Sequence, residues 1–337
     1  GPYCEEGMAK LSNTLSELMK ISWAVNVLGE ATPKVKDYIL SFGEILSSII
    51  MSIALKGEGL NVKTFTGREA GIITDENFGE ARPIHEISSR LVKEKLMSPL
   101  KSDIIPVVTG FIAGTLEGKT TVLGRGGSDY TATLIAKYLG AKEVRLYTNV
   151  PGVMTADPSI IPNAKVIPEL SFREAMELAY LGAKRFHPKT FEPLKGSNIV
   201  VRVTSIDNAD GGTIISEKGG GSHLKAVVAL KNLALVTVYG AEMVGRLGTA
   251  AEVMSVAAKE GVNIIGILQP VSEISISLAV SSTSAYKLAK ALSKLRKDGI
   301  VEEVEVCSNV LGVSAVSYTH LRAHETSLHL VCRLLLE

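Results

Sequence analysis

The sequence predicts an α/β protein in which a mostly parallel sheet with helices on both faces is followed by a smaller α+β module. Between residues 41 and 204 short β-type runs alternate with helical runs, and strands separated by helices are typical of a parallel sheet. After a glycine-rich segment at 217–222, EKGGGS, a leading strand precedes a βαββα pattern. The length of 337 residues also suggests two domains.

Composition argues against several classes of protein. The net charge of +1 gives no indication of a nucleic-acid or membrane-surface partner. The cysteines, Cys4, Cys307 and Cys332, are far apart, which fits a reducing cytoplasm rather than a disulfide framework or a metal site. We find no apolar run of membrane-spanning length, and Glu5 and Glu6 stand where a signal peptide has basic residues. We therefore expect a cytoplasmic protein with no membrane partner and no metal-ligand set of its own.

Two helices are predicted first. Apolar residues recur at spacings of three and four over 8–28, which predicts a helix. A second helix is predicted to start at Ser41, where the letters SFGE form a capping box with Glu44, and to stop at Gly57. Capping alone would explain Glu44, so a structural role and a role in binding an ammonium group remain equally open.

The next elements lead to a glycine-rich turn. Strands are predicted at 62–66 and 104–109, with a helix over 84–96 between them. The stretch GTLEGKT at 114–120 resembles a phosphate-binding loop but is one residue short between its glycines, so a hairpin turn is predicted there. A strand at 120–123 then enters GRGGSDYTA, residues 124–132, and a helix over 131–139 follows.

The chemistry of this turn indicates an anion site. Glycines at the start of a helix let backbone N–H groups and the positive end of the helix dipole approach an anion. Arg125 adds a cationic fork suited to a carboxylate or a phosphate, and Asp129 either caps the helix or organises cations around a phosphate. The alternative is a connection with a purely structural role.

The second half of the larger domain contains further loops at element ends. A strand at 144–148 runs into TNVPGV, where open α/β sheets bind ligands, although an ordinary Pro-Gly turn is equally possible. A helix is predicted to begin with the capping box of Ser171 and Glu174 and to end at Gly182. In the following letters, GAKRFHP, the basic residues can complement the helix end, and His187 is expected to be a loop histidine.

After the glycine-rich segment the pattern predicts a small ferredoxin-like module. Strands are predicted at 226–230, 234–239, 264–268 and 274–280, with helices at 250–259 and 285–296. Residues 300–316 are expected to start a second unit of this kind that is incomplete. The remainder, 317–337, contains three histidines, at 320, 324 and 329, and is expected to be a non-native tail rather than a metal site.

Taken together, these motifs resemble those of aspartate kinases, members of the amino-acid kinase family with C-terminal ACT domains. The resemblance implies a three-layer catalytic sandwich in 1–216, a linker in 217–224 and an ACT domain in 225–299. It implies transfer of the ATP γ-phosphate to L-aspartate, with Mg²⁺ carried by ATP, giving 4-phospho-L-aspartate for lysine, threonine and methionine biosynthesis.

The resemblance also implies roles for single residues. Glu44 would hold the aspartate amino group, Arg125 its α-carboxylate, and Ser128 would line the substrate pocket. Asp129 would be the catalytic residue that organises the phosphate-binding lysines. The residues implied to contact the nucleotide are Thr148, Asn149, Asp157 and Lys184.

The ACT resemblance implies an amino-acid effector, threonine or lysine, and a homodimer formed through ACT domains. The residues implied to contact the effector are Met243, Gly248, Thr249, Asn263 and Gln269. For each of them, plain fold chemistry is the alternative.

The sequence departs from the family pattern in three places. The family opens with a strand and a Lys-Phe-Gly-Gly loop whose lysine stabilises the transferring phosphate, and no such motif occurs here, so we expect a clipped chain with little activity. Asn149 replaces the usual aspartate, and Met154 and Ser159 replace a tyrosine and an arginine. Two alternatives stay open: another amino-acid kinase, of glutamate or acetylglutamate type, and a non-catalytic amino-acid-binding regulatory subunit.

Overall fold

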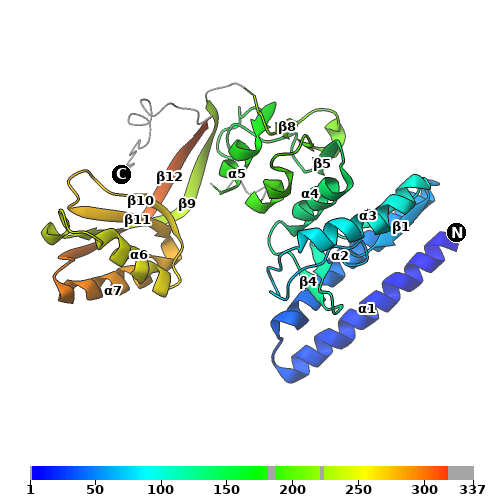
Figure 1. Ribbon diagram of the computed structural model, residues 1–337, viewed down its shortest axis with the longest axis horizontal. Helices are drawn as coiled ribbons and strands as arrows, with labels where there is room; N and C mark the ends of the chain where they lie inside the picture. Colours follow the sequence, from blue (N-terminus) through cyan, green and yellow to red (C-terminus); the bar gives the residue numbers. More distant parts are fainter. Residues whose placement is uncertain (1, 181–186, 221–223, 318–337) are drawn as a thin grey trace. The chain divides into compact units, whose positions relative to one another are not determined.

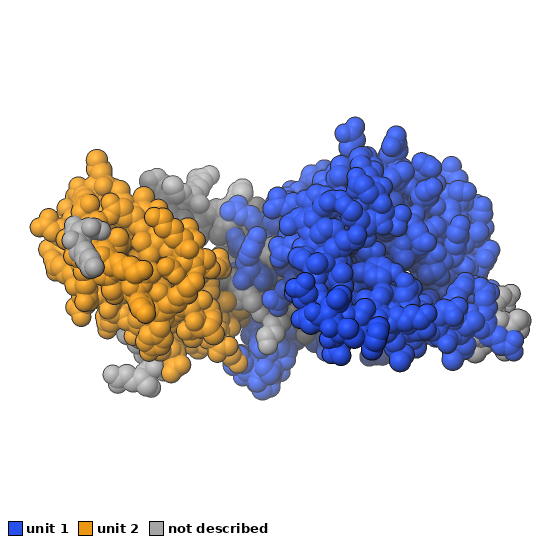
Figure 2. Space-filling view, turned by 90° about the horizontal axis from the view of Figure 1, so that it is seen from below, with its two compact units in different colours: residues 1–226, 316–319 blue, residues 227–315, 320–337 orange. Residues whose placement is uncertain are grey.

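The computed structural model describes residues 2–180, 187–220 and 224–317. These residues form two compact units, coloured separately in Figure 2. Unit 1 runs to residue 226 and takes in residues 316 and 317, and unit 2 covers residues 227–315. The boundary between the two units lies ten residues after residue 216, the predicted end of the catalytic domain.

Unit 1 begins with two long helices, α1 (Pro2–Leu28) and α2 (Pro33–Gly57), which lie side by side (Figure 1). The predicted start of the second helix at Ser41 is wrong. Thr32 is the N-cap, and its Oγ1 accepts a hydrogen bond of 3.3 Å from the backbone N–H of Val35. Ser41 lies inside α2, where its Oγ donates to the carbonyl of Tyr38 at 2.7 Å. Glu44 therefore has no helix start to cap, because α2 begins at Pro33, eleven residues before it.

The buried side of α2 is mostly polar and its outward side is apolar. Its buried side chains are those of Asp37, Ser41, Phe42, Ser48 and Ser52. With these side chains α2 packs against β1 (Val62–Phe65), β2 (Ile105–Val108) and β4 (Thr120–Val122). On length and composition α2 could cross a membrane, which corrects the expectation that no apolar run is long enough. Those packing contacts identify it as an element of unit 1.

An exposed apolar groove runs along the seam between α1 and α2, with a volume of about 1140 Å³. Met19 and Trp23 are 71% and 69% exposed there. The lining residues of this seam groove are Met8, Leu11, Ser12, Leu15, Ser16, Met19, Lys20, Trp23, Ala24, Leu46 and Ile50.

The centre of unit 1 consists of short strands and two helices around a buried core. β1 pairs in parallel with β2, and β3 pairs with β4 in an antiparallel hairpin, which confirms the hairpin prediction at 114–120. The core includes Ile72, Leu96, Leu123 and Leu134. The elements are β1 (Val62–Phe65), α3 (His85–Lys101), β2 (Ile105–Val108), β3 (Ile112–Gly114), β4 (Thr120–Val122) and α4 (Gly127–Leu139).

The rest of unit 1 is built on a four-stranded sheet with the order β5-β7-β8-β6. The β5–β7 and β6–β8 pairs are parallel and the β7–β8 pair is antiparallel. The α/β class is thus confirmed, and the parallel pairs are divided between this mixed sheet and the two-stranded sheet of β1 and β2. The predicted capping box is confirmed: Glu174 Oε2 accepts from the N–H and Oγ of Ser171 at 2.7 and 2.9 Å. The elements are β5 (Glu143–Tyr147), β6 (Glu169–Ser171), α5 (Phe172–Tyr180), η1 (Pro188–Leu194), β7 (Val200–Thr204), η2 (Ile206–Asn208) and β8 (Thr213–Ser216).

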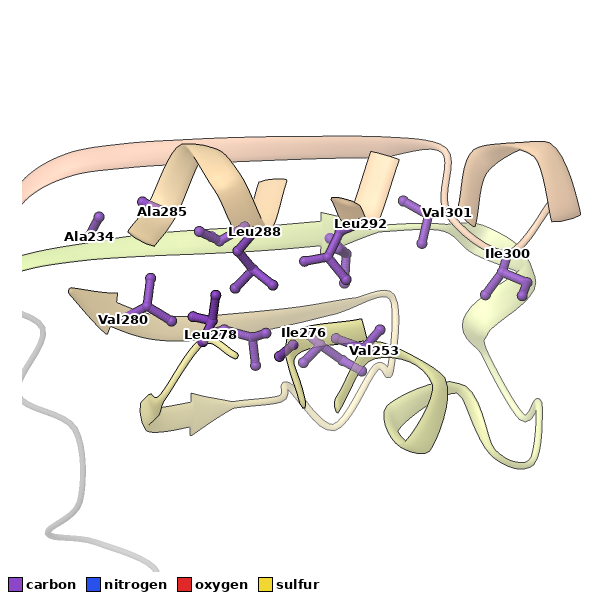
Figure 3. Packing of buried hydrophobic residues seen from close by; sticks show 14 of the residues in the cluster. Ala234, Val253, Ile276, Leu278, Val280, Ala285, Leu288, Leu292, Ile300 and Val301 are labelled. Atoms are coloured by element: carbon purple, nitrogen blue, oxygen red, sulfur yellow. The ribbon is translucent and has the colours of Figure 1, made fainter. Parts of the chain in front are cut away.

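Unit 2 has the ferredoxin-like order βαββαβ, with an antiparallel sheet of order β10-β11-β9-β12. Figure 3 shows its core, where Ala234 and Ile276 of the sheet face Val253 and Leu288 of the helices. The elements are β9 (Leu224–Tyr239), η3 (Ala241–Met243), α6 (Thr249–Lys259), β10 (Ile264–Leu268), β11 (Ser275–Ser281), α7 (Ser282–Leu292), η4 (Ser293–Asp298) and β12 (Glu303–Ser317).

Two boundaries in unit 2 differ from the sequence analysis. The two strands predicted at 226–230 and 234–239 are one strand, β9, in which Asn232 takes a left-handed φ of 61°. The segment predicted to start a second unit at 300–316 instead supplies β12, which pairs with β9 as the fourth strand of the same sheet. The fourth strand is what completes the ferredoxin-like order, so this module extends beyond residue 299.

Candidate functional site

The glycine-rich turn connects β4 to α4. Gly124 and Gly126 have φ values of +77° and +73°, in the left-handed region that side-chain-bearing residues rarely adopt. α4 begins at Gly127, four residues before the predicted start, and Gly126 is its N-cap with no side-chain capping bond. Asp129 therefore lies in the first turn of α4 and is free of any capping role.

Close packing of the turn requires glycine at positions 126 and 127. A Cβ on Gly126 would lie 2.3 Å from the Cβ of His187. A Cβ on Gly127 would lie 2.9 Å from Cδ2 of Phe111, whose own φ of 64° is unusual for a bulky residue. The turn is thus held between the loop after β2 on one side and the residue that caps η1 on the other.

The loop after β2 also contacts Ser128. A Cβ on Gly110 would lie 2.8 Å from the Cβ of Ser128 and 2.9 Å from its Cα. Because β1 and β2 are parallel, their carboxyl ends meet at the same edge, where open α/β folds place ligands. Sequence reasoning missed Gly110 and Phe111, although their position directly after a strand of a parallel pair was a signal.

α2 brings Glu44 to the first turn of α4. The Oγ of Ser128 lies 3.5 Å from Oε1 of the half-buried Glu44, so the structure brings these two predicted residues together. Arg125 is exposed in the same turn, and its guanidinium forms no ion pair with the residues that the structure describes. A carboxylate and a guanidinium close to one turn are complementary to the ammonium and carboxylate of a free amino acid.

Asp129 is partly buried, and its removal from water raises the pKa of its carboxyl group. Within residues 2–180, 187–220 and 224–317 its carboxylate has no hydrogen bond or ion pair, so it is available to a cation. The same residues hold no group of three or more His, Cys, Asp or Glu side chains that could bind a metal. Mg²⁺ commonly binds through one or two carboxylates and the phosphates of a nucleotide, and one unpaired carboxylate fits that mode.

Three of the four residues expected to contact a nucleotide, Thr148, Asn149 and Asp157, lie in the loop after β5. The N–H of Thr148 donates to the carbonyl of Thr204 at 2.8 Å, and its Oγ1 donates to Oδ1 of Asn149 at 3.3 Å. Oδ1 of Asp157 accepts from the N–H and Oγ of Ser159 at 2.9 and 2.7 Å, so Ser159 closes a turn here. Lys184 lies outside the described residues, and the nucleotide contacts stay a prediction.

The residues expected to contact an effector do not all share one surface. Met243 is 2% exposed and packs in the core of unit 2, which favours a structural role for its side chain. Asn263 and Gln269 lie at opposite ends of β10, about 20 Å apart along a strand at roughly 3.3 Å per residue. One amino-acid ligand within a single chain is too short to reach both.

The start of α6 remains a suitable place for a small ligand. Gly248 is the N-cap of α6 with φ +93°, and a Cβ there would meet no atom within 4 Å. Thr249 follows as the first helical residue, and its Oγ1 donates to the carbonyl of Arg246 at 3.3 Å. The N–H of Gly245 donates to Oε2 of Glu273 at 3.0 Å, which ties this loop to the loop that follows Gln269.

Comparison with known proteins identifies relatives of both units of the chain. Residues 7–205 match the amino acid kinase family and residues 236–295 match the ACT domain. The chain is 34% identical to chloroplastic aspartokinase 1 of Arabidopsis thaliana over 86% of this chain and 51% of the relative. It is also 34% identical to lysine-sensitive aspartokinase 3 of Escherichia coli, over 82% of this chain and 62% of the relative. The chain thus spans about half the length of the curated relatives it matches.

Solved structures show the same fold. Escherichia coli aspartokinase III in complex with lysine and aspartate superimposes with a TM-score of 0.78 and 29% identity, covering 96% of this chain and 72% of that one. The same enzyme in complex with aspartate and ADP gives a TM-score of 0.74 and 30% identity, covering 92% and 69%. With a kinase region matched over more than half of its length and an ACT region behind it, the chain belongs to the amino acid kinase family.

Proposed function

We propose that this chain acts as an aspartate kinase, transferring the γ-phosphate of ATP to the side-chain carboxylate of L-aspartate to give ADP and 4-phospho-L-aspartate. The observation that carries the proposal is the approach of Glu44 Oε1 to Ser128 Oγ at 3.5 Å, beside the exposed Arg125. These groups match the charges of a free amino acid. The fold shared with a structure that holds aspartate and ADP supports the choice of substrates.

In this proposal each residue has a positioning or electrostatic role, as phosphoryl transfer requires. Glu44 binds the substrate ammonium, Arg125 its α-carboxylate, and Ser128 lines the pocket between them. The N-terminus of α4 directs N–H groups toward the phosphate side. Asp129, unpaired and partly desolvated, organises cations there. Bound Mg²⁺ would neutralise charge on the nucleotide phosphates, and Asp129 would supply a carboxylate to hold it.

The nucleotide side of the proposal assigns the remaining predicted residues. We place ATP at the loop after β5, within reach of Thr148, Asn149, Asp157 and Lys184. A cytoplasmic location and a role in lysine and threonine biosynthesis complete the proposal, supported by the similarity to lysine-sensitive aspartokinase 3 of Escherichia coli.

Binding and turnover test this function separately. Titration calorimetry should show binding of L-aspartate in preference to L-glutamate and N-acetyl-L-glutamate. Trapping an acyl phosphate with hydroxylamine in the presence of Mg²⁺-ATP should give a hydroxamate that depends on aspartate. Arg125→Ala should weaken aspartate binding by roughly 10- to 100-fold, because a charge-assisted hydrogen bond contributes about 1.5–3 kcal/mol. The matched control is Arg173→Ala, an exposed arginine of α5 near Glu177, which should bind like the parent chain.

A second candidate is a non-catalytic protein that binds an amino acid through the same site. One observation favours it: Ser159 stands where the family pattern has an arginine, and losing one charge-stabilising group can cost several kcal/mol of barrier. Aspartate binding without hydroxamate formation would support this candidate. Preference for L-glutamate or its acetyl derivative would instead support another amino-acid kinase, and no binding of any of these would contradict both.

For unit 2 we propose binding of an amino-acid effector, threonine or lysine, at the start of α6. Support comes from the open N-cap at Gly248 and from the lysine complex of Escherichia coli aspartokinase III. We also propose a homodimer through ACT domains, supported by the exposed apolar side chains of Ile265 and Ile267 on the sheet-edge strand β10. Thr249→Val should weaken effector binding without changing aspartate binding, as measured by calorimetry.

A further inference from the structure

Asp37 is a buried carboxylate that the proposed reaction does not use. It lies in the second turn of α2 and is only 1% exposed. Its Oδ2 accepts two backbone hydrogen bonds, from the N–H of Gly79 at 3.0 Å and from the N–H of Val122 at 3.1 Å. Burying a carboxylate is costly, and hydrogen bonds to its charged form offset that cost. Such a group is therefore expected to have a specific task.

Both partners of Asp37 border the start of the glycine-rich turn. Val122 is the last residue of β4, two residues before Gly124. Gly79 and Glu80 lie against Gly124 itself, since a Cβ there would be 3.2 Å from the carbonyl oxygen of Gly79 and 3.2 Å from Cγ of Glu80. One carboxylate oxygen thus ties two chain segments at the base of the turn to α2.

The same helix carries the substrate-facing carboxylate. Glu44 follows Asp37 by seven residues, and a separation of two helical turns places both side chains on the same side of α2, about 10 Å apart along its axis. At the other end of this span, Glu44 meets Ser128 in the first turn of α4. Asp37 and Glu44 therefore connect the turn to α2 at two points. Asp37 binds the segments next to Gly124, and Glu44 contacts Ser128.

We propose that Asp37 is a positioning residue: it fixes the glycine-rich turn against α2, so that Arg125 and Ser128 stand at the correct distance from Glu44 to bind an amino acid. The aspartate part of this proposal rests on the proposed function. The placement of the turn does not, and it can be measured without any ligand.

Two substitutions and one control test the proposal in the full chain. Asp37→Leu keeps a side chain of similar size but removes the acceptor, and Asp37→Asn keeps one acceptor oxygen. Ser52→Ala is the matched control, because Ser52 is also a buried polar residue of α2 and bonds instead to Thr64 Oγ1 at 2.7 Å, on β1. Hydrogen exchange by mass spectrometry follows residues 122–130 and, as a reference, the sheet strands at 143–147 and 200–204.

In Asp37→Leu we expect exchange over 122–130 to accelerate by about tenfold or more, since both backbone hydrogen bonds to the carboxylate are lost. Protection of the reference strands should stay unchanged. Asp37→Asn should restore most of the protection, and Ser52→Ala should leave the turn at parental protection. Aspartate affinity should fall in the same order, by tenfold or more in Asp37→Leu and by less than threefold in Ser52→Ala.

Uniform acceleration over all segments in Asp37→Leu and in Asp37→Asn would overturn the proposal, because it would show a general structural role. Unchanged protection of 122–130 in a folded Asp37→Leu chain would overturn it as well. If Asp37→Leu does not fold, Asp37→Asn should still accelerate exchange over 122–130 slightly more than over the reference strands, and equal acceleration of all segments would overturn the proposal. If the parent chain does not bind aspartate, the proposed function fails, and the exchange data still decide whether Asp37 fixes the turn.

Discussion

Gly110 lies so close to Ser128 that a methyl group added at position 110 would displace the glycine-rich turn. In Gly110→Ala the new Cβ would meet Cβ and Cα of Ser128 at 2.8 and 2.9 Å, and a backbone atom cannot move aside cheaply. We expect at least tenfold weaker aspartate binding by calorimetry, because a contact so close is nearly impossible without a shift of the turn. Gly43→Ala is the matched control. Nothing lies within 4 Å of that position in α2, so it should keep parental binding and gain up to about 1 kcal/mol of stability.

His187 makes the stability of unit 1 depend on pH. Burial lowers the pKa of its imidazole below the ordinary value of 6.5, and the nearby positive charges of Lys189 and Arg125 lower it further, against an opposite effect of Glu80. The folded state therefore holds His187 neutral. Its contribution to stability is present above the ordinary pKa and is lost as the pH falls through the lowered one.

Substitution of His187 tests the direction of this pH dependence of stability. The free energy of unfolding of the parent chain, from urea titrations between pH 7.5 and 5.5, should decrease toward acid. His187→Gln should make this decrease shallower, because the proton that only the unfolded state binds has been removed. An equally steep or steeper decrease in the variant would contradict the neutral assignment.

At the scale of elements, the residue at which α2 begins determines whether Glu44 has a capping role or a binding role. Thr32→Ala should destabilise the chain by about 1 kcal/mol, the usual cost of losing an N-cap. Glu44→Gln should leave the free energy of unfolding nearly unchanged, since Glu44 caps nothing, while weakening aspartate binding. Chemical denaturation of both variants measures this contrast. A loss of stability in Glu44→Gln as large as in Thr32→Ala would restore the capping interpretation.

The elements also show which parts of the fold the sequence could predict. Periodic helices such as α3, the hairpin of β3 and β4, and the capping box of Ser171 were predictable, because local patterns specify them. The start of α2 was not, because the capping-box letters at Ser41 lie inside a helix that Thr32 caps nine residues earlier. Glu44 and the turn could be recognised from motifs. Asp37 and His187 could not be given a place at the turn, because only tertiary packing brings them there.

At the scale of the whole molecule, β12 decides where unit 2 ends. A fragment of residues 224–317 contains all four strands and the buried core of that unit, so it should fold alone and unfold cooperatively. A fragment of residues 224–299 lacks the strand that pairs with the inner strand β9, and it should lose cooperative thermal unfolding by circular dichroism. Cooperative folding of the shorter fragment would show instead that residues 303–317 are dispensable to this module.

The seam groove between α1 and α2 has a consequence for any spectroscopic study of this chain. Trp23 is the single tryptophan of the sequence, and it stands in that groove with most of its surface in water. Intrinsic tryptophan fluorescence therefore reports the solvent exposure of this groove and does not report the packing of the two buried cores. Acrylamide should quench the native chain almost as strongly as the chain in urea. A ligand, a subunit or a denaturant that changes the emission will have changed the surroundings of α1.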